Sequence, residues 1–104
     1  MAPEQTGKIR QIVRSYRDRL FDARNGVQKA EAQLEDMMND DVVDQNATKP
    51  VIDRLAAGRS NLTHLVTEMS IQVRAVLTAD QWHQLVRLWR DSQKKKLADT
   101  QVAQ

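Results

Sequence analysis

The stretch LTADQW, residues 77–82, separates two long amphipathic segments and carries the signals of a helix start. The hydroxyl of Thr78 can accept a hydrogen bond from a free backbone N–H of the following helix. Gln81 lies three residues on and can accept from the backbone N–H of Thr78, which completes a capping box. Leu77 and Trp82 stand at the two positions of a hydrophobic staple. The chain is therefore predicted to begin a new helix at Thr78, with a fixed entry angle.

The segment from Pro3 to about Asn39 is predicted to be one long helix of roughly 55 Å. Its apolar residues alternate in spacings of four and three, the signature of a coiled-coil-like seam: Ile9, Val13, Tyr16, Leu20, Ala23, Val27, Ala30, Leu34 and Met37. Gly26 lies inside this seam and costs about 1 kcal/mol relative to alanine. It marks either a bend or a split into two shorter helices.

The segment NDDVVDQNATKP, residues 39–50, is rich in turn-forming residues and is predicted to connect this helix to a second one. Thr48 is the best cap candidate, with Pro50 in the first turn, whereas Asp44 or Asn46 would cap an earlier start. A second seam follows, with Arg59 as its polar interruption and Leu65 widening its apolar face: Ile52, Leu55, Arg59, Leu62, Val66, Met69, Val73 and Val76.

A third helix opens at Thr78 and is expected to bury five side chains: Trp82, Leu85, Val86, Leu88 and Trp89. The fold class is therefore all-α, a long antiparallel helical hairpin with a third helix folded back. We expect a single domain over residues 1–97 and a polar, disordered tail over 98–104. A hairpin this thin buries little area per residue, so we also predict a homodimer.

Composition excludes several classes of protein. The chain has 104 residues, a net charge of +2 and no cysteine, which removes disulfides, thiolate zinc sites and cysteine catalysis. The low net charge does not indicate nucleic-acid binding. No run of eighteen apolar residues exists, so we expect no membrane insertion, and no signal peptide is visible.

Charge is segregated along the first predicted helix. Its first half is basic, and its end and the following loop are acidic: Lys8, Arg10, Arg14, Arg17, Arg19 and Arg24 against Glu31, Glu35, Asp36, Asp40, Asp41 and Asp44. One interpretation is a set of solvated faces with paired charges. The other is a basic surface beside apolar patches, suited to loose binding of acidic or unfolded chains.

Catalytic and metal-binding patterns are absent from the sequence. Neither His64 nor His83 belongs to a known zinc motif, and no serine or threonine has a base and an orienting acid at readable spacing. Met37 and Met38, together with the nearby Asp40 and Asp41, could bind a soft metal ion. Such methionines more often pack at the tip of a hairpin. We expect a non-enzyme without a cofactor or a metal site.

With three helices placed, residues 77–81 resemble the LTxxQ motif of the Spy/CpxP family of small, all-helical periplasmic proteins. The family carries the motif twice, and the opening MAPEQ, residues 1–5, is similar to LTPEQ with its Leu-Thr replaced. The following KIRQIVRSYRDRL resembles the first helix of the family. The resemblance covers nearly the whole chain.

The resemblance implies a curved, antiparallel homodimer in the periplasm that binds unfolded client proteins without ATP and suppresses aggregation in envelope stress. CpxP-like members also restrain an envelope-stress sensor kinase. Client binding would use basic residues of the first helix, Arg10, Arg14, Arg17 and Arg24. The motif residues Leu77, Thr78, Gln81 and Trp82 would be structural.

The resemblance also leaves an alternative function, a periplasmic heavy-metal sensor or resistance protein of the ZraP or CnrX type. CnrX-like sensors place a His-x-x-x-Met pair before the second motif, where this chain has Met69 and Val73. That departure argues against their metal site here. A second departure is Ala2, which cannot cap the first helix as a threonine would.

Overall fold

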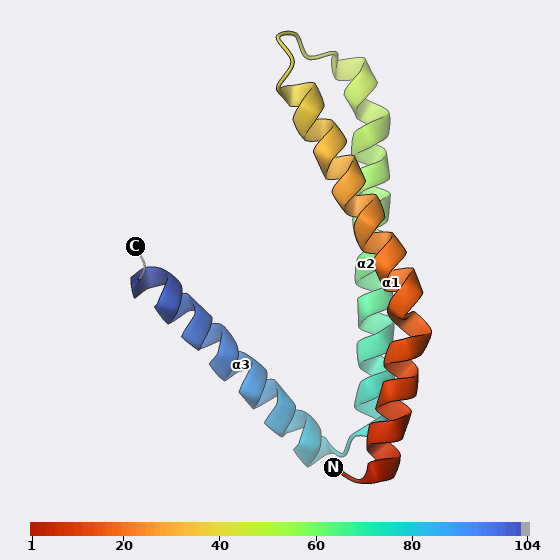
Figure 1. The fold of residues 1–104 in the computed structure, drawn as a ribbon, viewed down its shortest axis with the longest axis vertical. Helices are drawn as coiled ribbons and strands as arrows, with labels where there is room; N and C mark the ends of the chain where they lie inside the picture. Colours follow the sequence, from red (N-terminus) through yellow and green to blue (C-terminus); the bar gives the residue numbers. More distant parts are fainter. Residues whose placement is uncertain (103–104) are drawn as a thin grey trace.

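A computed structural model describes residues 1–102 and contains three helices in that range. They are α1 (Pro3–Met38), α2 (Gln45–Val76) and α3 (Ala79–Val102). Helices α1 and α2 run side by side as an antiparallel hairpin, and α3 turns back from the open end of the hairpin and diverges from it (Figure 1). The molecule measures 58 × 38 × 17 Å, so it is only about one helix and a half thick. The predicted all-α fold, a hairpin with a third helix, is confirmed.

The hydrophobic core is a single seam between α1 and α2. Tyr16, Ala23 and Leu65 are buried at its centre. Four partly buried side chains pack against them: Ile12, Leu20, Leu62 and Met69. Further along the seam towards the tip, Val27, Ala30 and Val51 are buried as well. Most of the seam predicted for α1 is therefore the face that meets α2. The exception is Val13, which is 41% exposed, because its neighbour Ile12 packs against the core instead.

The α2 seam predicted from the sequence is wrong by one residue at several positions. Ile52 and Val66 are 50% and 42% exposed, whereas their neighbours Val51 and Leu65 are 2% and 8% exposed. Between them Gly58, not Arg59, faces α1, because a Cβ added to Gly58 would lie 3.2 Å from Cγ2 of Val27. The register thus places the residue without a side chain opposite Val27, where an added Cβ would be crowded.

Arg59 consequently lies outside the seam that was predicted to include it. It is exposed, and its guanidinium pairs with the carboxylate of Glu31 on α1 at 2.9 Å. This ion pair crosses from one helix to the other on the surface, where such pairs contribute at most about 1 kcal/mol.

Gly26 does not split the first helix. Helix α1 is continuous over 36 residues, and the space around the Cα of Gly26 is open, with no atom within 4 Å of an added Cβ. All described residues other than glycine have negative φ, and so do the described glycines. Gly26 therefore lowers helix stability without serving a turn or a close contact.

Helix α2 begins earlier than its best sequence cap predicted. Asp44, not Thr48, is the N-cap, and its carboxylate accepts from the backbone N–H groups of Asn46 and Ala47 at 3.0 and 3.2 Å. Pro50 consequently lies inside the helix rather than in its first turn. A carboxylate cap satisfies two free donors and complements the positive end of the helix dipole, which favours the earlier start.

The junction between α2 and α3 has the capping box that its sequence predicted. The backbone N–H of Gln81 donates to Oγ1 of Thr78 at 3.2 Å, and the backbone N–H of Thr78 donates to Oε1 of Gln81 at 2.9 Å. Leu77 is buried and Trp82 is half-buried. Arg74 braces the turn, since its guanidinium donates to the carbonyl of Leu77 and lies 6.0 Å from the ring centre of Trp82.

The first helix begins with only one of the two hydrogen bonds of a capping box. Ala2 has the extended backbone of an N-cap but no side-chain oxygen, so the only capping bond is from its own N–H to Oε1 of Gln5 at 3.0 Å. The side chain of Gln5 then reaches across to α3. Its Nε2 donates to Oε1 of Gln81 at 2.9 Å, and Nε2 of Gln81 donates back to Oε1 of Gln5 at 3.2 Å.

Paired amides of this kind join the starts of two helices that are 76 positions apart. Nε2 of Gln5 also donates to the carbonyl of Val76, the last residue of α2, at 3.1 Å. The two motif glutamines therefore bring the beginning of α1, the end of α2 and the beginning of α3 to one point. We name this set of hydrogen bonds the glutamine joint.

Helix α3 does not bury the apolar face that was predicted for it. Leu85, Leu88 and Trp89 are 46%, 68% and 62% exposed, and only Trp82 and Val86 are half-buried. The joint fixes the base of α3, but the helix diverges from the hairpin, so nothing in the described chain covers this face (Figure 1). The helix also continues through residues 98–102 of the tail that was predicted to be disordered over 98–104, and residues 103–104 lie outside the described part of the chain.

We expect Gly26→Ala to raise the free energy of unfolding by about 1 kcal/mol, because alanine is the better helix former and the site has room. Gly58→Ala should gain clearly less, since its new methyl group presses on Val27. Urea unfolding followed by circular dichroism at one protein concentration measures both. Equal gains would contradict the close approach at Gly58.

We expect Thr78→Ala to lower the free energy of unfolding by about 1 kcal/mol through the lost cap. Ala2→Thr is the converse change, because it supplies the hydroxyl that the first box lacks, and it should raise stability by a similar amount. The same unfolding measurement tests both variants. An unchanged midpoint for Thr78→Ala would refute the role of this cap.

Candidate functional site

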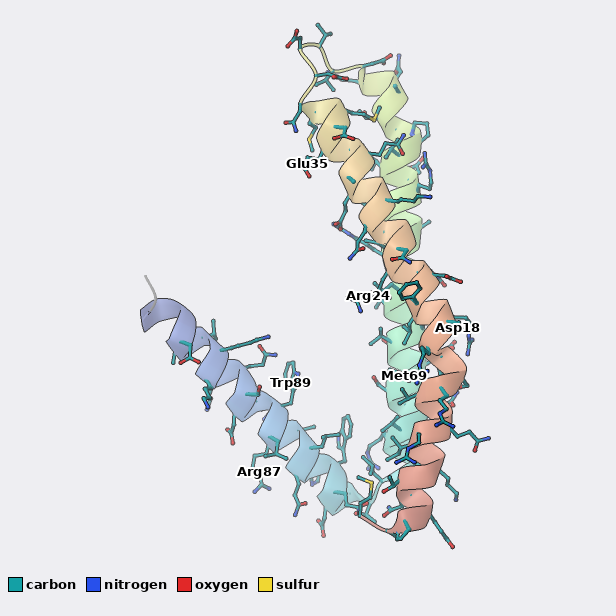
Figure 2. The ribbon with its side chains drawn as sticks, in the orientation of Figure 1. Asp18, Arg24, Glu35, Met69, Arg87 and Trp89 are labelled. Carbon is teal, nitrogen blue, oxygen red and sulfur yellow. The ribbon has the colours of Figure 1, made fainter. Side chains whose placement is uncertain are left out.

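The outer face of α1 carries the four arginines that the sequence analysis singled out. Arg10, Arg14, Arg17 and Arg24 are all exposed. Their spacing leaves one gap, which Phe21 fills, so the five residues follow each other at intervals of four, three, four and three. Residues so spaced lie on one face of a helix. We name this set the arginine stripe; Figure 2 labels Arg24 on it.

Phe21 gives the arginine stripe an apolar centre. Its ring is 64% exposed, and Val13 at the edge of the stripe is 41% exposed. Within residues 1–99 none of the four arginines forms an ion pair, in contrast to Arg59 with Glu31. The guanidinium groups are therefore available beside an aromatic ring, a combination that favours contact with both apolar and acidic groups.

Arg19 belongs to a different part of the surface. Its guanidinium lies 4.3 Å from the ring centre of Tyr16 and donates to the carbonyl of Ser15 at 3.1 Å. Arg19 lies two residues from both Arg17 and Phe21, on a different face of the helix, and it stacks on the buried tyrosine.

Helix α3 presents a second amphipathic surface. Leu85, Leu88 and Trp89 form its exposed apolar part. Figure 2 shows Trp89 on the side of α3 that faces the hairpin and Arg87 on the opposite side. Basic residues follow towards the end of the helix: Arg90, Lys94, Lys95 and Lys96. We name residues 85–96 the α3 surface.

The hairpin tip has the opposite charge and is also apolar. Met38, Val42 and Val43 are 63%, 84% and 42% exposed. They lie among acidic residues at the end of α1 and in the loop: Glu35, Asp36, Asp40, Asp41 and Asp44. The tip is thus complementary to the α3 surface in charge, and both expose large apolar side chains.

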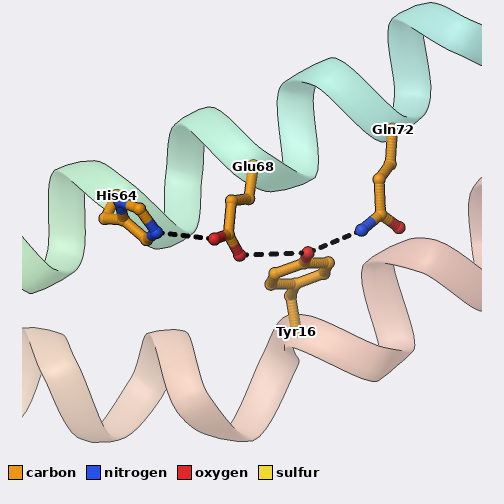
Figure 3. A network of polar contacts seen from close by, with 4 residues as sticks. All are labelled: Tyr16, His64, Glu68 and Gln72. Atoms are coloured by element: carbon orange, nitrogen blue, oxygen red, sulfur yellow. Dashed lines mark hydrogen bonds and ion pairs between the residues drawn. The ribbon is translucent and has the colours of Figure 1, made fainter.

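A polar network crosses the hairpin beside the core (Figure 3). The hydroxyl of Tyr16 on α1 accepts from Nε2 of Gln72 at 2.7 Å and donates to Oε2 of Glu68 at 3.4 Å. The other carboxylate oxygen of Glu68, Oε1, lies 2.6 Å from Nε2 of His64 on the same helix. The network leads from a tyrosine that is 4% exposed to a histidine whose side chain is 72% exposed.

The pairing of His64 with Glu68 was not predicted from the sequence. The signal was available, because a spacing of four places two side chains on one helical face. The pair belongs to no known zinc motif, so comparison with such motifs does not predict it. His83 has no such partner, since Arg87 stands four residues after it.

The described residues contain no cluster of three histidine, cysteine or carboxylate side chains that could hold a metal ion. Across the described range, no helix is long and apolar enough to cross a membrane.

Comparison with known proteins places the fold in a family. A family model described as heavy-metal resistance matches residues 1–84, which include both helices of the hairpin, the glutamine joint and the first turn of α3. No curated protein and no solved structure matches the chain. The chain belongs to the heavy-metal resistance family, the group that includes the Spy-, CpxP- and ZraP-like all-helical proteins.

Proposed function

We propose that the protein is a non-enzymatic chaperone of the Spy/CpxP type, which binds unfolded or partly folded proteins in the periplasm without ATP. The observation that carries the proposal is the arginine stripe. It places an exposed phenylalanine among four unpaired arginines on the solvent side of a rigid helix. Unfolded chains offer the matching groups, apolar side chains and carboxylates, in no fixed arrangement.

The chemistry of the stripe suits weak and mobile contacts. One exposed ring offers little apolar area, and exposed charge pairs are each worth less than about 1 kcal/mol. A client held by such contacts can exchange between them, fold and leave. A deep apolar groove would bind more tightly but would hold the client in an unfolded state.

The proposal is tested by light scattering of a chemically unfolded client diluted into buffer with near-stoichiometric protein and no ATP. We expect suppressed aggregation. Reversing two charges of the stripe, Arg14→Glu with Arg17→Glu, should raise the amount of protein needed for the same suppression by roughly fivefold, since two exposed attractions become repulsions.

The matched control is Lys8→Glu with Lys29→Glu. Both lysines are exposed on α1 and off the stripe, so the change in net charge is the same. The control should suppress aggregation like the unmodified protein. Equal loss in both variants would reduce the effect to net charge, and no suppression by the unmodified protein would refute the chaperone function.

We further propose that the working unit is a homodimer in which the hairpin tip of each copy packs on the α3 surface of the other. The tip is acidic and the α3 surface is basic, and each exposes large apolar side chains that its own chain leaves uncovered. Such an exchange is self-complementary and closes after two copies. It would also bury Trp89, which is 62% exposed in the single chain.

Sedimentation velocity over a range of concentrations tests the dimer. Leu88→Glu should raise the dissociation constant by at least about tenfold, because a buried leucine is worth about 1.5–3 kcal/mol and a tenfold change about 1.4. Phe21→Glu is the control, since Phe21 lies on the arginine stripe and should leave dimerisation unchanged while weakening chaperone activity. A monomer at all concentrations would refute this arrangement.

Metal binding is the second candidate function. The family match favours it, because the family is described by heavy-metal resistance. Within the described residues the donors for such a role are few, and the pair formed by His64 and Glu68 is the arrangement that brings an imidazole and a carboxylate together.

A further inference from the structure

We propose that His64 and Glu68 form a two-residue clip for a divalent transition-metal ion, Zn²⁺ or Cu²⁺, on the exposed side of α2. The inference rests on the second candidate function, metal binding, and assigns it to specific side chains. It does not depend on the chaperone proposal.

The geometry brings two metal-binding atoms to one point. Nε2 of His64 and Oε1 of Glu68 are 2.6 Å apart, and their side chains are 72% and 43% exposed. When the imidazole carries a hydrogen on Nε2, this contact is a hydrogen bond from His64 to Glu68. When the imidazole is neutral with its hydrogen on Nδ1, both atoms direct lone pairs into the same space. A divalent cation can then take the place of the hydrogen in that hydrogen bond.

The carboxylate, whose side chain is 43% exposed, is linked to the core by one long hydrogen bond of 3.4 Å. Oε2 of Glu68 accepts from the hydroxyl of Tyr16, which is 4% exposed and in turn accepts from Gln72. Outer hydrogen bonds of this kind orient a metal ligand and raise its affinity for the ion. Tyr16 is therefore a positioning residue for the clip, because it acts on the metal only through Glu68.

The surroundings leave the site open to a cation. The other charged residue that lines the hollow beside His64 is Arg59, and its guanidinium is engaged by Glu31 at 2.9 Å. Arg19 is held over the ring of Tyr16. The hollow is otherwise lined by hydroxyl groups, from Ser60, Thr63 and Thr67.

The donor set selects the class of metal. An imidazole nitrogen with a carboxylate oxygen suits Zn²⁺ and Cu²⁺, whereas Mg²⁺ prefers oxygen ligands alone. The chain has no cysteine, so a thiolate site for softer ions is excluded. Two protein ligands leave the remaining positions to water, and we accordingly expect weaker binding than in a closed structural zinc site.

The test is titration of the untagged full chain with Zn²⁺ and with Cu²⁺, by calorimetry and by competition with a chromophoric chelator, with Mg²⁺ as the negative control. We expect one ion per chain. His64→Ala and Glu68→Gln should each weaken binding by at least about tenfold. Tyr16→Phe keeps the ring in the core but removes the hydroxyl, and should weaken binding by about tenfold.

The matched control is His83→Ala, which removes the other histidine, a residue followed at the same spacing by Arg87 instead of a carboxylate. It should bind metal like the unmodified chain. Circular dichroism confirms that each variant is folded, and thermal unfolding gives a second measure, because an ion bound only to the folded hairpin raises its Tm.

The outcomes separate the clip from the function on which it rests. Loss of binding in His64→Ala and Glu68→Gln, with His83→Ala unchanged, supports the clip. Binding that survives in both variants overturns the clip and leaves metal binding to other residues. If the unmodified chain binds neither ion, the clip and the metal-binding function both fail.

Discussion

A pair of helices can bury only one stripe of each, and the rest of this structure follows from that limit. The seam between α1 and α2 takes Tyr16, Ala23, Val27 and Leu65 out of water, and the hairpin has no second layer to cover what remains. Every other large apolar residue of the hairpin must be shielded by neighbouring side chains or meet a partner. The arginine stripe, the hairpin tip and the α3 surface are three of the places where apolar groups remain exposed, and Ile52, Val66 and Ile71 on α2 are others. The exposure of apolar side chains is therefore a consequence of the thin fold as a whole.

The glutamine joint decides where these surfaces lie. Gln81 takes part in two sets of hydrogen bonds. Its backbone N–H and its side-chain oxygen form the capping box with Thr78, and the same side-chain amide pairs with that of Gln5. A cap alone would set the local angle of α3. The added pairing ties that angle to the end of the hairpin, so that α3 diverges from α1 and α2 and leaves its apolar face uncovered. The motif residues have a structural role, and the result of that role is an exposed apolar surface on α3 rather than additional core.

Much of the fold could be predicted from the sequence, and the errors have a common physical cause. The 4–3 spacing identified most of the α1 seam, with an error at Val13 in place of Ile12, and LTADQW identified the start of α3. Both signals depend only on neighbours in the chain. The α2 register failed where two apolar residues are adjacent, at Val51 with Ile52 and at Leu65 with Val66. Periodicity cannot choose between adjacent residues. The choice is made by α1, whose Val27 requires the space beside Gly58. The N-cap at Asp44 and the exposure of α3 likewise depend on energies and contacts beyond the local pattern.

The two candidate sites also differ in how far they could be predicted from the sequence. The four arginines could be selected from charge alone, and a helical wheel would have added Phe21 between them. The spacing of four residues could also have predicted the pairing of His64 with Glu68. The hydrogen bond that anchors Glu68 to Tyr16 could not be predicted, because these two residues lie 52 positions apart along the chain. That anchor is what distinguishes this pair from the many histidine–carboxylate pairs on helix surfaces. An ion bound by the clip would contact Glu68, which is hydrogen-bonded to Tyr16 of the core. Its binding would therefore stabilise the contact between α1 and α2. The arginine stripe, by contrast, depends on no contact with α2. Metal occupancy would thus stabilise the hairpin without covering the stripe, which makes the two proposed functions compatible in one chain.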